Sequence, residues 1–138
     1  HDAIIFSLYQ LKGVRGRKAV VVLSDGDDTS RLVSYDDGLE FARRSGTAIY
    51  TIGLDIGAMK MGIRSKLETL STETGGRAFF DAKAAELASV YAEIERELRS
   101  QYLLAFAPSP PGKPGVFSPI EVKVKRGLKA RAPRGYYP

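Results

Sequence analysis

The chain has 138 residues, of which 43% are hydrophobic and 27% charged, a composition typical of one folded globular domain rather than a disordered or fibrous chain. It contains no cysteine and a single histidine. This excludes disulfides, thiolate catalysis and cysteine-ligated zinc, and it argues against Ser-His-Asp catalysis. Any metal site is expected to use oxygen ligands. No apolar run approaches the ~18 residues of a transmembrane helix, so we expect no membrane insertion.

The charge is unevenly distributed along the chain. Lys and Arg number 21 against 16 Asp and Glu, a net charge of +5. The excess lies near the C-terminus, in Lys123, Lys125, Arg126, Lys129, Arg131 and Arg134. Such patches can bind nucleic acids, but no nucleic-acid-binding motif accompanies this one, and solvent faces of edge strands are often lysine-rich to prevent aggregation. We therefore expect no nucleic-acid partner.

Residues 1–100 alternate between helical and strand patterns. In chain order, apolar spacing predicts a helix over 2–12, a strand over 18–23, a helix over 35–45, a strand over 48–54, a helix around 63–70, a strand over 78–80 and a helix over 87–98. Ser34 and Gly46 are the expected caps of the second helix. Strands that alternate with helices predict a parallel sheet flanked by helices, in which ligands bind at the carboxyl ends of the strands.

Residues 101–138 follow a different pattern, and we interpret them as β-strands and a basic tail packed on the same unit as residues 1–100. The segment 102–106 is a predicted strand, and 108–114 is a proline-rich loop. Apolar and polar residues then alternate over 120–125 and 128–132 around Gly127. This pattern predicts an antiparallel hairpin appended to the α/β domain.

The predicted strand over 18–23 ends at the densest cluster of carboxylates in the chain. The loop is Ser24-Asp25-Gly26-Asp27-Asp28-Thr29-Ser30. Several carboxylates after a buried strand supply hard oxygen ligands for Mg²⁺, Mn²⁺ or Ca²⁺. The same residue types also bond to local backbone in an ordinary solvated turn that caps a helix. Residue chemistry alone leaves both interpretations open.

Four segments, in this order along the chain, carry a family resemblance. They are residues 17–30, with the strand-Ser-Asp-Gly motif, 48–53, 74–80 and 94–102. Together they resemble von Willebrand factor A domains, in a bacterial subfamily whose members carry this C-terminal strand region. The resemblance implies a Rossmann-like, doubly wound, mainly parallel sheet, a role in protein binding or adhesion rather than catalysis, and a secreted or periplasmic location.

The resemblance also implies a metal-ion-dependent adhesion site, of which only part is present. The family's site uses an Asp-x-Ser-x-Ser loop, a threonine and the aspartate of the Ser-Asp-Gly loop, and only the last is here, as Asp25. Asp25 is the expected ligand of Mg²⁺ or another divalent cation. The residues that would surround the cation and shape the loop are Ser24, Asp27, Asp28 and Thr29, and those that would meet a partner are Asp27, Thr29 and Ser30.

The opening residues His1–Ile4 resemble the helix that follows the family's threonine loop, so the chain is expected to begin downstream of three strands. The strand over 18–23 would then lie at an edge of the sheet with Val20, Val21 and Val22 unprotected. Exposed apolar edges recruit other strands. We expect a second copy, a donated strand from a separate fragment, or the chain's own C-terminal strands to cover this edge.

A catalytic alternative rests on the same loop. Asp25-Gly26-Asp27-Asp28-Thr29 also satisfies the Asp-x-Asp-x-Thr pattern of haloacid-dehalogenase-like phosphatases. Asp25 would then be the nucleophile and Asp27 the general acid and base, with Mg²⁺ holding the phosphate. No later pair of acidic metal ligands follows another predicted strand, so protein binding is the preferred hypothesis.

Overall fold

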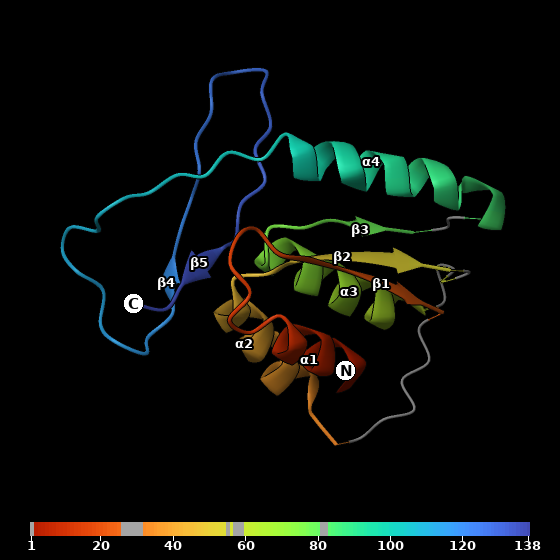
Figure 1. The fold of residues 1–138 in the computed structure, drawn as a ribbon, viewed down its shortest axis with the longest axis horizontal. Coiled ribbons are helices and arrows are strands. Elements are labelled where there is room, and N and C mark those ends of the chain that lie inside the picture. Colours follow the sequence, from red (N-terminus) through yellow and green to blue (C-terminus); the bar gives the residue numbers. More distant parts are fainter. Residues whose placement is uncertain (1, 26–31, 55, 57–59, 81–82) are drawn as a thin grey trace.

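The computed structural model describes residues 2–25, 32–54, 56, 60–80 and 83–138 (Figure 1). Its elements are α1 (Asp2–Gln10), β1 (Ala19–Ser24), α2 (Tyr35–Ser45), β2 (Ala48–Gly53), α3 (Met61–Glu73), β3 (Ala78–Phe79), the 3-10 turn η2 (Ala84–Glu86), α4 (Leu87–Arg99), β4 (Ser118–Pro119) and β5 (Gly135–Tyr136). The helices and strands predicted over residues 2–99 are confirmed, with ends that differ by up to three residues. The fold is mixed α/β.

The first sheet contains three parallel strands in the order β1-β2-β3. Helices α1, α2 and α3 cover one face and α4 covers the other (Figure 1). Side chains of β2 alternate between the two faces, as the pleat of a strand requires. Ile49 packs in the cluster under α1–α3, whereas Tyr50 and Ile52 pack in the cluster under α4. The central strand is therefore buried on both faces, which explains its apolar sequence without a helical period.

Local signals fix the ends of α2. The side chain of Ser34 accepts a hydrogen bond from the backbone N–H of Asp37 at 3.1 Å, which satisfies one of the free donors at a helix start. Gly46 ends the helix with φ 61°, a left-handed conformation that glycine adopts without strain. Both predicted caps are thus confirmed.

The connection from α3 to β3 is tied closely to β2. Thr74 Oγ1 accepts a hydrogen bond from the N–H of Ile49 at 3.0 Å and donates to the carbonyl of Leu70 at 2.9 Å. The backbone of Gly76 passes so near β2 that a Cβ there would lie 2.0 Å from the carbonyl oxygen of Ile49. The pair Gly75-Gly76 therefore ends α3 and allows this close approach.

The predictions for the C-terminal strands were partly wrong. Residues 102–106 are extended but belong to no strand, and 120–124 and 128–132 form no ladder. The antiparallel sheet consists instead of β4 and β5, with Ser118 opposite Tyr136, and it is prolonged by one hydrogen bond from the N–H of Ile120 to the carbonyl of Arg134 at 2.8 Å. The predicted turn at Gly127 is present, with the N–H of Leu128 bonded to the carbonyl of Lys125.

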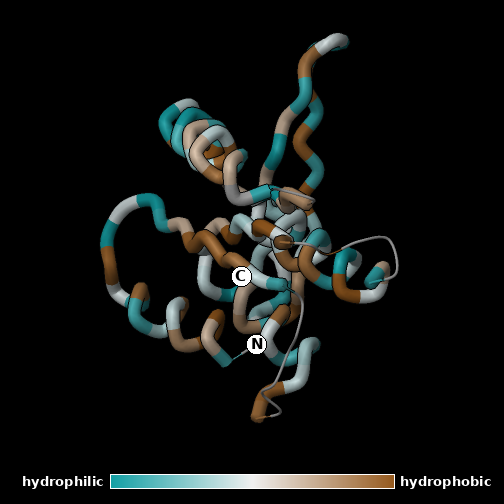
Figure 2. The backbone as a smooth tube through the Cα atoms, turned by 90° about the vertical axis from the view of Figure 1, so that its right-hand side faces the viewer, coloured by the Kyte–Doolittle hydropathy of each residue, from teal (hydrophilic) through white to brown (hydrophobic). Residues whose placement is uncertain are grey.

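The predicted hairpin is absent because the chain after residue 132 bonds to the end of α3. The N–H of Arg134 donates to the carbonyl of Glu73, and Pro133 forms a bridge with Thr74, so this stretch is held by the end of α3. Residues 120–134, which lead up to this attachment, form a projecting arm along which polar and apolar residues alternate (Figure 2). The alternation predicted extended backbone correctly, but it carried no information on the bonding partner.

The β1 strand lies at an edge of the sheet, as expected. Among the described residues it pairs only with β2, and Val20, Val21 and Val22 are half-buried. The C-terminal strands do not cover this edge, because β4 and β5 form a sheet of their own. Of the three expected covers, this one is therefore wrong for the described part of the chain.

Candidate functional site

The carboxyl ends of the three parallel strands lie at the same side of the molecule (Figure 1). Ser24 ends β1 and is followed by Asp25, whose side chain is exposed, and Gly53 ends β2. The carbonyl of Ser24 accepts a hydrogen bond from the N–H of Leu54 at 2.9 Å, which holds the loop after β1 against the loop after β2. The structure therefore places Asp25 where parallel α/β sheets bind their ligands.

Two cationic side chains from the start of α3 reach this edge. Lys60 Nζ donates to the backbone carbonyl of Asp25 at 3.1 Å. The guanidinium of Arg64 donates to the carbonyl of Ile56 at 2.9 Å and lies over the ring of Phe80, 4.3 Å from its centroid. Sequence reasoning did not include Lys60 or Arg64 in the site. Their position at the start of a helix that follows a strand could have indicated them, since such helix starts lie at the carboxyl edge of a parallel sheet.

A close-packed apolar layer supports the site from below. Ile56 is fully buried. A Cβ on Gly53 would lie 2.8 Å from the ring of Phe80 and 2.9 Å from the side chain of Ile56, so a larger residue at the end of β2 would require these side chains to shift. The end of β2 is therefore closely packed against Ile56 and Phe80.

The described residues do not by themselves fit a divalent cation. Ser24 contributes a hydroxyl and Asp25 a carboxylate, and no group of three or more His, Cys, Asp or Glu side chains that could hold a metal occurs within the described ranges. Mg²⁺ and Ca²⁺ take about six to eight oxygen ligands, and the ammonium of Lys60 puts a like charge beside the position. The other predicted members of the site, Asp27, Asp28, Thr29 and Ser30, lie outside the described residues. Asp27 is also the general acid and base of the phosphatase alternative.

A second polar cluster lies away from this edge and joins β3, α4 and the arm. Arg77 pairs with Glu93 and with Glu97, the latter at 3.2 Å, and Arg131 pairs with Glu97 at 2.6 Å. Burial acts to lower the pKa of Arg77, but hydrogen bonds and charges from the two glutamates outweigh it and raise that pKa. These ion pairs balance one another, so the cluster serves to attach the arm.

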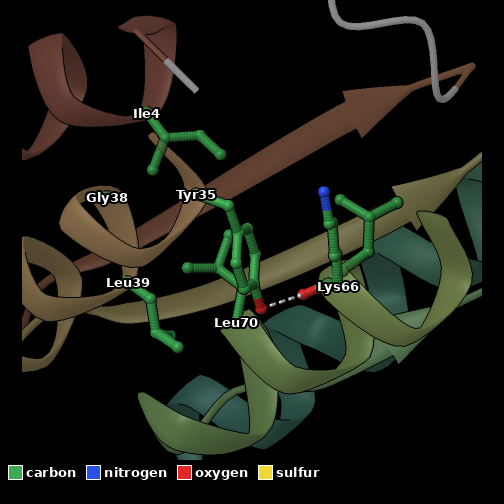
Figure 3. Close-up of a pocket in the computed structure, with 7 residues that line it drawn as sticks. Ile4, Tyr35, Gly38, Leu39, Lys66 and Leu70 are labelled. Carbon is green, nitrogen blue, oxygen red and sulfur yellow. Dashed lines mark hydrogen bonds between the residues drawn. The ribbon is translucent and has the colours of Figure 1, made fainter. Parts of the chain in front are cut away.

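An apolar and a polar cavity lie among the described residues. The apolar one, between α1, α2 and α3, has a volume of about 30 Å³, enough for about one water molecule. Tyr35 closes it with a hydrogen bond from its hydroxyl to the carbonyl of Lys66 at 3.0 Å (Figure 3). The other is a polar cleft of about 460 Å³ between the arm and the α3–β3 connection. Its wall contains Arg77 and Arg131, whose charges the glutamates already satisfy.

Comparison with known proteins gives the fold and nothing beyond it. A scan against protein-family models found no match to this chain, and no curated protein matches it in sequence. Among solved structures, it is similar to the crystal structure of an uncharacterized membrane spanning protein from Vibrio fischeri, with a TM-score of 0.52 and 23% sequence identity over 64% of this chain. The chain spans about half, 51%, of the length of that protein's chain. None of the described helices of the present chain is long and apolar enough to cross a membrane.

Proposed function

We propose that this chain is a protein-interaction module of the von Willebrand factor A type, which binds its partner at the carboxyl end of the parallel sheet. The observation that carries the proposal is the position of Lys60, whose ammonium donates to the backbone carbonyl of Asp25 directly after the edge strand β1, at the carboxyl end of the sheet. The mixed α/β fold, with a parallel sheet flanked by helices, is compatible with the resemblance. The same resemblance supports a secreted or periplasmic location.

The chemistry of this edge favours an acidic group on the partner. Lys60 and Arg64 are half-buried and place two cationic groups beside Asp25, and each donates a hydrogen bond to a backbone carbonyl. Charge complementarity of this kind selects partners and speeds their association. Because Ser24 and Asp25 alone do not make a cation site, binding is proposed to occur by direct contact. A divalent cation would need further oxygen ligands, such as those of Asp27, Asp28 and Thr29.

The open edge of β1 is proposed as a second contact for a protein partner. An unpaired strand edge presents free N–H and C=O groups, to which an added strand from a second copy or a separate fragment can bond. Four apolar side chains of β1 are half-buried, Val20 and Val22 on one face and Ala19 and Val21 on the other. They would gain burial from such an addition.

The test uses a short peptide of glutamates, a lysine peptide of equal length as the control, and calorimetry with and without Mg²⁺. Direct contact predicts that the acidic peptide binds without Mg²⁺, that Lys60→Met weakens binding and that Asp25→Asn strengthens it, because a repelling charge is removed. Glu121→Gln, which removes an exposed carboxylate from the arm, should change the affinity little.

Other outcomes of these measurements would point to a cation site, contradict the proposed function or establish the phosphatase alternative. Binding that requires Mg²⁺ and is lost in Asp25→Asn would mean that an adhesion-type cation site forms with the loop over 26–30. Equal affinity for both peptides, or no binding of either under any condition, would contradict the proposed function. Hydrolysis of p-nitrophenyl phosphate that is lost in Asp25→Asn and in Asp27→Asn would establish the phosphatase alternative instead.

A further inference from the structure

The segment Tyr102–Phe106 is an extended apolar stretch exposed on the surface of the chain. Its large side chains are 90% exposed at Tyr102, 89% at Leu103, 73% at Leu104 and 61% at Phe106. The five residues carry no charge. Their backbone groups bond to no other residue within the described ranges. A stretch with strand-forming side chains and unpaired backbone groups is a template for pairing with another strand.

The segment is nevertheless held in place at both ends. The carbonyl of Gln101 accepts a hydrogen bond from Arg17 at 3.1 Å. At the other end, the ring of Phe106 meets the ring of Tyr136 edge-on, with 5.6 Å between centroids. The chain runs between these contacts from α4 toward the C-terminal sheet (Figure 1). It is therefore an extended segment held at both ends and not a frayed terminus, so less conformational entropy is lost on pairing than for a free chain end.

We propose that Tyr102–Phe106 is a self-association strand, which pairs antiparallel with the same segment of a second copy of this chain around a two-fold axis at Leu104. The sequence Tyr-Leu-Leu-Ala-Phe is self-complementary in this arrangement. Tyr102 lies opposite Phe106 of the second copy on one face, on both sides of the central pair of Leu104 residues. Aromatic and aliphatic cross-strand pairs of this kind are the ones that stabilise antiparallel strands.

Charge selects this segment over the other extended part of the chain. The arm also has exposed apolar residues, Val124 and Leu128 among them. It carries a cluster of basic residues as well, Lys123, Lys125, Arg126 and Lys129. Two arms side by side would place like charges opposite one another, which destabilises a strand pair. Two uncharged segments meet no such penalty.

The expected dimer is weak. A ribbon of two five-residue strands buries less than the ~1,200 Å² of a standard stable interface, so the dimer should be concentration-dependent. Each copy carries a net charge of +5, and salt screens the repulsion between them. The affinity should therefore increase with salt, which is the opposite of the behaviour expected for a basic surface that binds an acidic partner.

The absence of cysteine makes a direct test available. At Leu104→Cys, the two sulfur-bearing residues would face each other with Cα atoms about 4.5–5.5 Å apart, within the ~4.4–6.8 Å that a disulfide needs. At Leu103→Cys the two positions are diagonal, about 7–8 Å apart. Under mild oxidation we expect a disulfide-linked dimer from Leu104→Cys, and little from Leu103→Cys or from Leu128→Cys in the arm.

Sedimentation of the cysteine-free chain provides the second readout. We expect a monomer–dimer equilibrium whose dissociation constant rises by about tenfold or more in Leu104→Lys, where two positive charges would face each other. Leu104 is exposed, so its substitution should leave the fold and the circular dichroism spectrum unchanged. A chain that stays monomeric at every concentration would overturn the proposal. So would a dimer that Leu104→Lys leaves intact, which would assign association to another surface such as the edge of β1.

Discussion

Gly76 offers a sharp test of how the α3–β3 connection is attached to the sheet. A Cβ at this position would lie 2.0 Å from the carbonyl oxygen and 2.6 Å from the carbonyl carbon of Ile49, so Gly76→Ala forces two backbones apart by about 1 Å. The obstacle is the backbone of the central strand, which cannot rotate away as a side chain can. We therefore expect the loss to reach the upper end of the range for overpacking, about 3 kcal/mol of unfolding free energy. That corresponds to a fall of about 10 °C in Tm.

Gly62→Ala is the matched control for this substitution. Gly62 lies in α3, and a Cβ there would have no neighbour within 4 Å. Alanine favours a helix over glycine by up to about 1 kcal/mol, so this variant should be neutral or more stable. Urea unfolding followed by circular dichroism measures both variants. A loss of less than about 1 kcal/mol in Gly76→Ala would refute the close approach of the connection to β2.

Three further substitutions test the caps, the core and a buried hydroxyl. Ser34→Ala removes the cap of α2 and should cost about 1 kcal/mol in urea unfolding, and an unchanged midpoint would refute the cap. Ile94→Ala, at a position 3% exposed under the sheet, should cost about 2–5 kcal/mol, whereas a loss typical of a surface site would mean that α4 does not pack there. Burial raises the pKa of Tyr50, so its contribution to stability is complete below about pH 10 and is lost as the pH rises further. Tyr50→Phe should flatten this alkaline loss, and an identical pH profile in the variant would contradict the burial of the hydroxyl.

Most of the α/β part could be predicted from local signals because each signal acts within a few residues. The cap at Ser34 and the stop at Gly46 set the bounds of α2, and the apolar run over 48–54 identified the central strand. The apolar run over 18–23 predicts a strand buried on both faces, and its side chains pack against both core clusters while remaining half-buried. Its place at an edge followed from the family resemblance and not from its own residues.

The C-terminal part could not be predicted as well because pairing depends on contacts between distant residues. The alternation over 120–132 specifies extended backbone and one apolar face. Nothing in it reveals that Pro133 and Arg134 bond to the end of α3, or that Arg44 lies over the ring of Tyr137, 3.7 Å from its centroid. These contacts leave the arm without a ladder.

Of the described residues at the candidate site, Asp25 could be predicted from the sequence, whereas Lys60 and Arg64 could not. Asp25 follows a strand directly, so its place at the carboxyl edge follows from the parallel topology. Lys60 and Arg64 reach the same edge from α3, and they are separated from Asp25 by the whole of α2 and β2. Their effect on the site is electrostatic, and it appears only when the elements are placed in space.

Amide chemical-shift mapping with the glutamate peptide tests the central claim most directly, since it reports where the chain binds. The account predicts shifts that saturate at Ser24, Asp25, Leu54 and Lys60, at the carboxyl end of the sheet. It also predicts that they are reduced in Lys60→Met. Shifts confined to the basic arm, around Lys125 and Lys129, would contradict the account and assign acidic partners to the C-terminal patch.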